Sequence, residues 1–153
     1  MNEPVIAPAY APWILKKYQY FTLLLNSNNQ RYLGRSYAWL NRPGEMQRLS
    51  EITDEESSEL RLIMRDYEAA VARLWSPDHM NYLWLGNEFH NHKGHGHMHF
   101  VPRYESPRQY QQVTFTDENW GKNYVPHTQF SLSRTVLVAI RKALYHTLVR
   151  VES

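Results

Sequence analysis

Two stretches of aromatic and apolar residues in the first third of the chain predict a pair of β-strands. Residues 18–25 are mostly aromatic or apolar, and the polar cluster 26–30 that follows has the composition of a turn. The second stretch covers residues 35–40, and Pro43-Gly44 breaks it. We expect the two strands to form a hairpin.

A long amphipathic helix is predicted from Thr53 to about Trp75. Thr53 and Glu56 have the spacing of a capping box, and three consecutive acids place negative charge at the positive end of the helix dipole. Apolar residues at spacings of three and four then form one stripe: Leu60, Ile63, Met64, Tyr67, Ala70, Val71 and Leu74. Such a stripe needs a sheet to cover.

The second half of the chain predicts two more strands and a second helix. Residues 81–85 favour a strand, and the polar stretch 87–94 favours a loop. The next strand begins at His95, and Pro102 is expected to close it because proline cannot donate to the ladder. The final helix is predicted over residues 131–148. The order indicates an α+β domain with an antiparallel sheet, a main helix packed on one face and a C-terminal helix.

The length favours one domain, because 153 residues can bury most of their apolar surface in a single core. We expect this domain to span residues 1–153, with a core at about 18–103. Residues 1–17 form an N-terminal arm over the body, with a short helical turn at 13–16. Residues 104–153 form an extension, in which the aromatic cluster 120–124 is expected in the core or at a dimer contact.

Composition narrows the chemistry. Hydrophobic residues make up 42% and charged residues 21%, as in a globular protein, and the absence of cysteine excludes disulfides, thiolate ligands and a cysteine nucleophile. The net charge is only +2 and the basic residues are scattered, which favours a small phosphorylated ligand over a nucleic-acid polymer. The first residues lack the features of a signal peptide, and no apolar run is long enough for a membrane span. We therefore expect no membrane partner and a cytoplasmic location.

Three histidines in strict alternation are the strongest sign of a functional site. His95, His97 and His99 would share one face of a strand, because side chains on a strand have a period of two. The residues between them would point into the core. One histidine on a strand is often structural, but three in alternation favour a function. They could bind zinc, which accepts imidazole readily, or one could act as a nucleophile while its neighbours assist.

The sequence from His95 to Val101 resembles the His-X-His-X-His-X-X signature of the histidine triad superfamily. Pro102-Arg103 is similar to the Pro-Arg that often follows the signature, and residues 49–56 are similar to the start of the family's main helix. Asn87 stands before the triad, as an Asn or Gln does in the family. Judged by these motifs alone, the sequence resembles most the fragile histidine triad and dinucleoside polyphosphate hydrolase branch. Gly96 departs from the pattern, which has an apolar residue there.

This resemblance implies an enzyme, a nucleotide hydrolase or nucleotidyl transferase. His97 would attack the α-phosphorus and form a covalent nucleotidyl-histidine, while His95 and His99 hold the phosphate. The substrate would be a small nucleotide, expected to be a purine nucleotide. No cofactor would be required, although Mg²⁺ could accompany a polyphosphate substrate. Family members are typically homodimers whose central sheets join, and we expect a homodimer here.

The resemblance also implies substrate-binding roles outside the triad. The residues concerned are Asn87, Asn91, His92, Asn26 and Arg103. The first three lie in the loop that would close over the leaving group. Asn26 would contact the ribose, with a turn residue as the equal alternative. Arg103 would add positive charge, with a solvated surface arginine as the alternative. Two functional alternatives remain open, a nucleotide-binding protein with little turnover and a zinc enzyme.

Overall fold

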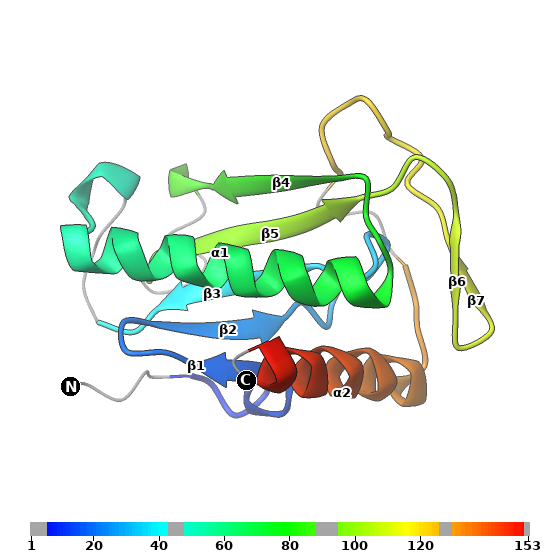
Figure 1. The fold of residues 1–153 in the computed structure, drawn as a ribbon, viewed down its shortest axis with the longest axis horizontal. Coiled ribbons are helices and arrows are strands. Elements are labelled where there is room, and N and C mark those ends of the chain that lie inside the picture. The colour runs from blue at the N-terminus through cyan, green and yellow to red at the C-terminus, as the bar shows by residue number, and fades with distance from the viewer. Residues whose placement is uncertain (1–5, 43–47, 88–94, 126–129, 152–153) are drawn as a thin grey trace.

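The computed structural model describes residues 6–42, 48–87, 95–125 and 130–151. Its main feature is a five-stranded sheet with two helices on one face (Figure 1). The short 3-10 helices η1 and η2 span Ala11–Trp13 and Leu49–Glu51. The strands and long helices are β1 (Ile14–Lys17), β2 (Phe21–Leu25), β3 (Ser36–Leu40), α1 (Asp54–Leu74), β4 (His79–Trp84), β5 (His97–Arg103), β6 (Arg108–Tyr110), β7 (Val113–Phe115) and α2 (Arg134–Val151).

The sheet has the order β1-β2-β3-β5-β4, and every neighbouring pair is antiparallel. β5 therefore lies inside the sheet, between β3 and β4. Trp39 of β3 is paired with His97, and Tyr37 is paired with His99. The expected α+β architecture is confirmed, and the sheet places the triad strand at its interior, where both neighbours fix the backbone.

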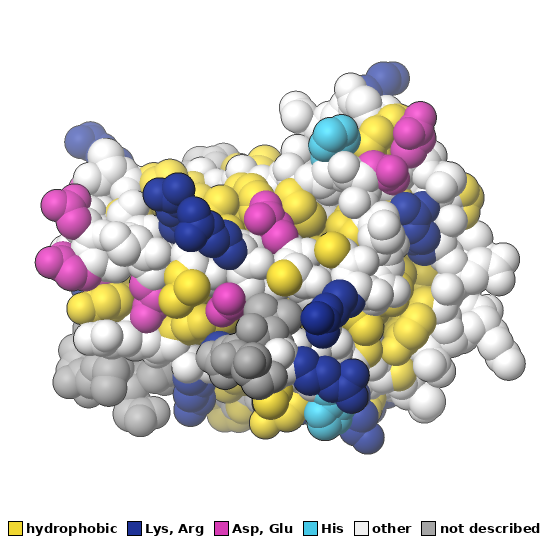
Figure 2. All heavy atoms as spheres, viewed as in Figure 1, with side chains coloured by type: hydrophobic (Ala, Val, Ile, Leu, Met, Phe, Trp, Pro, Cys, Tyr) yellow, Lys and Arg dark blue, Asp and Glu magenta, His cyan; other side chains and the backbone are white. Residues whose placement is uncertain are grey.

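The core lies between the sheet and the two helices. Leu23, Ala38 and Phe100 of the sheet are fully buried, as are Tyr67 of α1 and Leu144 of α2. The Tyr67 and Phe100 rings meet edge to face at a centroid distance of 5.2 Å. Figure 2 views this helix-covered side, on which basic and acidic side chains are mixed over α1. The helices cover one face of the sheet, which leaves the histidines to the other face.

The start of α1 has the predicted capping box. The Glu56 N–H donates to Thr53 Oγ1 at 3.0 Å, and the Thr53 N–H donates to Glu56 Oε1 at 2.9 Å. Burial tends to raise the pKa of Glu56, but hydrogen bonds from Arg42 and Thr53 outweigh it, so this pKa lies below its usual value. The Arg42 Nε to Glu56 Oε2 distance is 2.7 Å. The capping box and the Arg42–Glu56 ion pair thus fix the start of α1.

A second carboxylate of α1 attaches the sheet edge to the helix. Glu59 accepts hydrogen bonds from the N–H groups of Gln19, Tyr20 and Phe21, at 2.9, 2.6 and 3.0 Å. Gln19 and Tyr20 lie in the turn between β1 and β2, and Phe21 begins β2. One side chain therefore satisfies three backbone donors that the turn leaves without strand partners.

The expected helical turn at 13–16 is wrong. A 3-10 turn ends at Trp13, and Ile14–Lys17 form the edge strand β1. The expected strand 18–25 is shorter, because Tyr18 starts the turn and its N–H donates to the Phe21 carbonyl oxygen at 2.8 Å. Leu15 is buried against the helices, so pairing with β2 and burial together favour the strand over a helical turn.

Pro102 does not close the triad strand. β5 begins at His97 and continues to Arg103, with Pro102 paired opposite Met80 of β4. Pairing with β3 ends at Phe100, so the last part of β5 has a strand partner on one side only. A proline is tolerated in such a one-sided segment because no ladder hydrogen bond is lost.

The region after β5 contains a hairpin that the sequence did not predict. β6 and β7 are joined by Gln111 and Gln112, whose φ angles of 52° and 63° lie in the left-handed region. Turns of this kind are usually signalled by Asn or Gly. The final helix begins three residues later than predicted, at Arg134. Among the described helices, none is long and apolar enough to cross a membrane.

Candidate active site

The triad lies on the sheet face opposite the helices. His97 and His99 alternate with the core residues Met98 and Phe100, and their rings are 4.8 Å apart, centroid to centroid. His95 precedes β5, and its ring lies on the same side because Trp39 stacks on both His95 and His97. The structure therefore brings the three predicted histidines together on one face.

Trp39 was not predicted as part of this site. Its ring lies 5.0 Å from the His95 ring at an interplanar angle of 29°, and 5.8 Å from the His97 ring at 21°. Tyr37 approaches His97 edge-on, with the ring centroids 6.0 Å apart. The signal available in the sequence was the alternation in 36–40, which puts Tyr37 and Trp39 on one face, but their position beside the triad depends on the strand register.

The environment favours a neutral imidazole at the first triad position. Burial lowers the pKa of His95, and only the Leu40 backbone acts in the other direction. His97 Nδ1 lies 3.4 Å from the His95 carbonyl oxygen, at the long end of hydrogen-bond distances. When Nδ1 carries the proton, Nε2 of His97 keeps its lone pair and can attack an electrophile.

Asn26 lies in a turn, which was the alternative to a ribose contact. Its side-chain oxygen accepts from the N–H groups of Asn28 and Asn29, both at 3.1 Å, which forms an Asx-type turn after β2. The side chain of Gln30 continues this loop by donating to the Asn26 and Arg35 carbonyl oxygens. A ribose contact by Asn26 stays a prediction.

The loop before the triad is described only at its start. Asn87 is exposed. Asn91 and His92, both predicted to contact the substrate, lie outside the described residues. Their roles therefore stay predictions of the resemblance.

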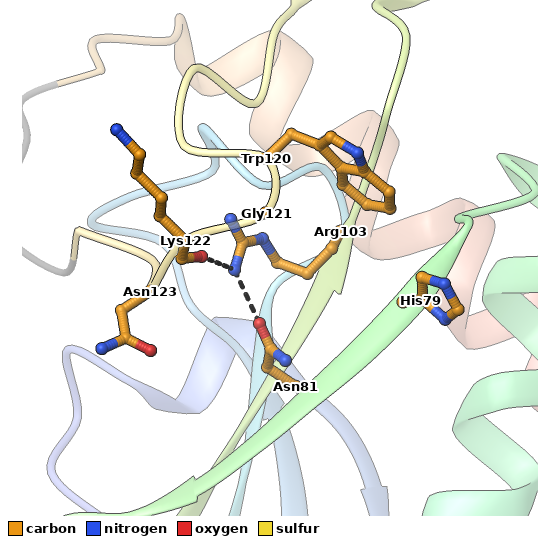
Figure 3. A pocket seen from close by; sticks show the side chains of 7 residues that line it. All are labelled: His79, Asn81, Arg103, Trp120, Gly121, Lys122 and Asn123. Carbon is orange, nitrogen blue, oxygen red and sulfur yellow. Dashed lines mark hydrogen bonds between the residues drawn. The ribbon is translucent and has the colours of Figure 1, made fainter.

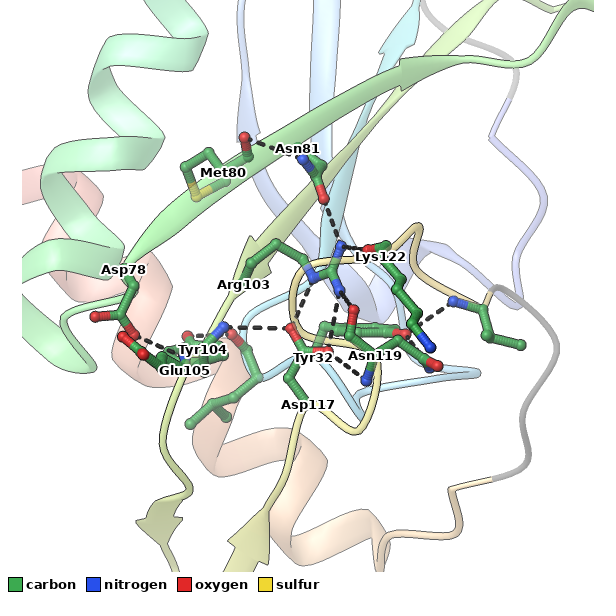
Figure 4. A network of polar contacts seen from close by, with 12 residues as sticks. Tyr32, Asp78, Met80, Asn81, Arg103, Tyr104, Glu105, Asp117, Asn119 and Lys122 are labelled. Atoms are coloured by element: carbon green, nitrogen blue, oxygen red, sulfur yellow. Dashed lines mark hydrogen bonds and ion pairs between the residues drawn. The ribbon is translucent and has the colours of Figure 1, made fainter.

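Arg103 is not a solvated surface residue, because only 4% of it is exposed. Its Nε and Nη2 donate to the two Asp117 carboxylate oxygens at 2.7 and 3.1 Å, and Nη2 also donates to the Asn119 carbonyl oxygen at 2.7 Å. Its Nη1 donates to Asn81 Oδ1 at 2.7 Å and to the Lys122 carbonyl oxygen at 2.8 Å (Figure 4). Every guanidinium nitrogen thus has a protein acceptor, which is a structural role. The predicted phosphate contact stays a prediction.

The aromatic cluster 120–124 divides between core and surface. Tyr124 is buried and packs with Tyr32 and Val101 in a small second core. Trp120 is half-buried and lies at a cavity beside Arg103. The expectation of a core position therefore holds for Tyr124.

Among the residues that the structure describes, no three histidine or acidic side chains are grouped so that they could hold a metal ion. The His97 and His99 rings meet edge to face at 73°.

No protein-family model matches this chain, and no curated protein matches its sequence. Solved structures do match its fold. A histidine triad protein from Marinobacter aquaeolei is 18% identical, with a TM-score of 0.64 over 98% of this chain and 99% of that chain. A hypothetical histidine triad nucleotide-binding protein from Sulfolobus tokodaii is 13% identical, with a TM-score of 0.64 over 92% and 85%. A Zn-bound histidine triad family protein from Mycobacterium smegmatis is 15% identical, with a TM-score of 0.59 over 91% and 85%.

The chain therefore has the histidine triad fold, as its sequence motif predicted. His97 and His99 of the triad lie on the interior strand β5, and His95 precedes this strand by two residues. The likeness to the dinucleoside polyphosphate hydrolase branch stays a prediction.

Proposed function

We propose that the chain is a nucleotide hydrolase or nucleotidyl transferase of the histidine triad type, with His97 as its nucleophile. The observation that supports this most is the position of His97. It lies between His95 and His99 on an interior strand, on the sheet face opposite the helices. The likeness of the fold to solved histidine triad proteins and the three alternating histidines are two separate observations, and both support this proposal.

In the proposed reaction His97 Nε2 forms a bond to the α-phosphorus of the substrate. The bond from this phosphorus to the leaving-group oxygen or nitrogen breaks, and the leaving group departs with the bonding electrons and takes a proton from solvent or from a neighbouring imidazole. Water or another acceptor then attacks the same phosphorus, the bond from this phosphorus to His97 Nε2 breaks with its electrons returning to the nitrogen, and the acceptor's proton passes to solvent or to a neighbouring imidazole. The nucleotide is released and His97 is regenerated.

The side chains around His97 would support this reaction in different ways. His99 and His95 can donate hydrogen bonds to phosphate oxygens whose charge grows in the transition state. The Trp39 ring lies nearly parallel to the His97 ring and can stabilise its cationic form by a cation–π interaction. Burial raises the pKa of Tyr37 well above its usual value, so its hydroxyl stays protonated.

We propose a purine nucleotide as the substrate, bound with the help of Asn87, Asn91 and His92. The description of the Sulfolobus tokodaii protein as nucleotide-binding supports a nucleotide ligand, and the purine base is part of our proposal. Mg²⁺ could accompany a polyphosphate substrate. A screen of dinucleoside polyphosphates, nucleoside phosphoramidates and nucleotide sugars tests the proposal, and failure to cleave any of them would contradict it.

We also propose a homodimer that pairs β4 with β4 of a second copy. β4 and β1 are the outer strands of the sheet. The Arg141 guanidinium donates to the Ile14 carbonyl oxygen of β1 at 2.8 Å, which protects that edge. Open strand edges tend to pair with other chains. Light scattering at micromolar concentration should give twice the chain mass, and a monomer mass would contradict the dimer.

Two alternatives remain. A nucleotide-binding protein with little turnover would be stabilised against heat by nucleotides without forming product. A zinc enzyme has support from the Zn-bound Mycobacterium smegmatis protein. Zinc analysis of the purified chain, with activity assays in a strong chelator, separates this alternative from a histidine nucleophile. The proposal predicts activity that survives chelation.

A further inference from the structure

A cavity of about 650 Å³ lies at the far end of β5 from the triad (Figure 3). His97 and Arg103 are six positions apart on β5, an even spacing, so both point to the same sheet face. A strand rises about 3.3 Å per residue, which places the cavity about 20 Å from His97. Its volume is typical of a small-molecule site. The lining residues are His79, Asn81, Arg103, Trp120, Gly121, Lys122 and Asn123.

A ridge of buried residues separates this cavity from the triad. Val101 lies between His99 and Arg103 along the sheet face and is covered by Tyr32 and Tyr124. The two tyrosine rings meet edge to face, 5.9 Å apart. The cavity is therefore separate from the triad site, and none of its lining residues belongs to the triad.

The floor of the cavity is preorganised. Arg103 is held by five hydrogen bonds to side-chain and carbonyl oxygens, including one to the Lys122 carbonyl oxygen. These bonds fix the loop 120–123 over the end of β5. Gly121 takes a φ of 81°, which lets the loop turn back toward the strands. A ligand would thus meet a formed wall, with little ordering cost.

The charge of the cavity favours an anion. Its described lining contains two cations, Arg103 and Lys122, and no acidic residue. Asp117 lies behind Arg103 and neutralises it, while the Lys122 side chain is exposed at the rim. Asn81 and Asn123 add amide groups that can donate hydrogen bonds.

Two aromatic rings line the side of the cavity that faces away from Lys122. The His79 and Trp120 rings are 5.8 Å apart, with an interplanar angle of only 15°. Figure 3 shows these rings on one side of the cavity and Lys122 on the other. The two rings stack on each other, so a planar ligand such as a nucleobase would stack on the outward face of this pair.

We propose that this cavity is a second binding site, which takes a nucleoside monophosphate. The phosphate binds Lys122 and Asn123, and the base packs against Trp120 and His79. The site goes beyond the proposed function, because it needs none of the three triad histidines.

Adenosine monophosphate is the probe for this site. Its binding is followed by NMR of the Trp120 indole N–H, which a spectrum of Trp120→Phe assigns. We expect two molecules bound per chain, with a titrating Trp120 signal. Lys122→Ala should weaken binding at this cavity about tenfold through loss of a charged hydrogen bond. Trp120→Leu lacks the reporting N–H, so its binding is followed by calorimetry, and loss of base stacking should weaken it by about the same factor. Lys142→Ala, an exposed lysine on α2, is the matched control and should change nothing.

Each part of the proposal can fail separately. A Trp120 signal that stays unchanged at millimolar nucleotide would overturn it, as would equal affinity in Lys122→Ala and wild type. Inorganic phosphate binding as tightly as the nucleotide would refute the role of the rings, and adenosine binding equally well would refute the role of Lys122. His97→Ala should keep this binding, so an error in the nucleophile assignment would leave the result intact.

Discussion

The two ends of β5 use the same sheet face in different ways. At the first end, His97 lies among aromatic rings, with Trp39 and His99 within 5.8 Å, centroid to centroid. At the other end, Arg103 is joined to Asp117 and to three further acceptors by hydrogen bonds of 2.7 to 3.1 Å. Ring contacts orient an imidazole without occupying all its hydrogen-bonding capacity. A saturated guanidinium, in contrast, holds a loop in place.

The largest effect is expected at the triad end. His97→Ala removes the attacking nitrogen and should abolish turnover while nucleotide binding remains. His95→Ala and His99→Ala remove supporting interactions worth about 3 kcal/mol, a loss of roughly a hundredfold in kcat. Single-turnover kinetics measure the loss in the chemical step, and binding assays measure any loss in nucleotide affinity. Three variants with equal losses would contradict separate roles.

At the Arg103 end the expected effect is on stability. Arg103→Met leaves the Asp117 carboxylate buried without its partner, since the exposed fraction of that side chain is 0%. Breaking a buried pair in this way costs about 3 to 5 kcal/mol of unfolding free energy. Urea denaturation measures it, with Lys122→Ala as the control at the same cavity. A loss below about 1 kcal/mol would mean that Arg103 does not hold the loop.

His97 and Arg103 also show which parts of the site could be predicted from the sequence. The triad and α1 were predictable because their signals are local: a period of two in His95–His99 and a capping box at Thr53. The partners of Arg103 were not, because Asp117 lies fourteen residues away across a hairpin. Trp39 was missed for a similar reason. Its contact with His97 exists only through the β3–β5 register.

Trp39 offers a smaller test of the triad end. Trp39→Leu should lower the rate of nucleotidyl transfer up to about tenfold by removing a cation–π interaction with the His97 ring. Trp39→Phe keeps an aromatic face and should restore most of the rate. We expect the change in kcat rather than KM, with a shifted pH profile. An equal loss in both variants, or a change in KM alone, would assign Trp39 to packing or substrate binding.

The smallest effect concerns the pH dependence of stability. Burial lowers the pKa of His95 below the usual histidine value of 6.5. The unfolded chain therefore binds this proton at a higher pH than the folded chain, so stability is present above pH 6.5 and is lost as the pH falls below it. Thermal unfolding from pH 7.5 to 5 should show a steeper loss in wild type than in His95→Gln. Parallel curves would mean that His95 does not contribute.

The most direct test of the account is to trap the covalent intermediate. Wild-type protein is mixed with substrate, quenched in alkali during turnover and digested for mass spectrometry, because phosphorus–nitrogen bonds to imidazole survive base better than acid. We predict one nucleotidyl group per chain, attached to His97, and none in His97→Ala. Turnover without an adduct, together with stoichiometric zinc and activity lost on chelation, would contradict a histidine nucleophile.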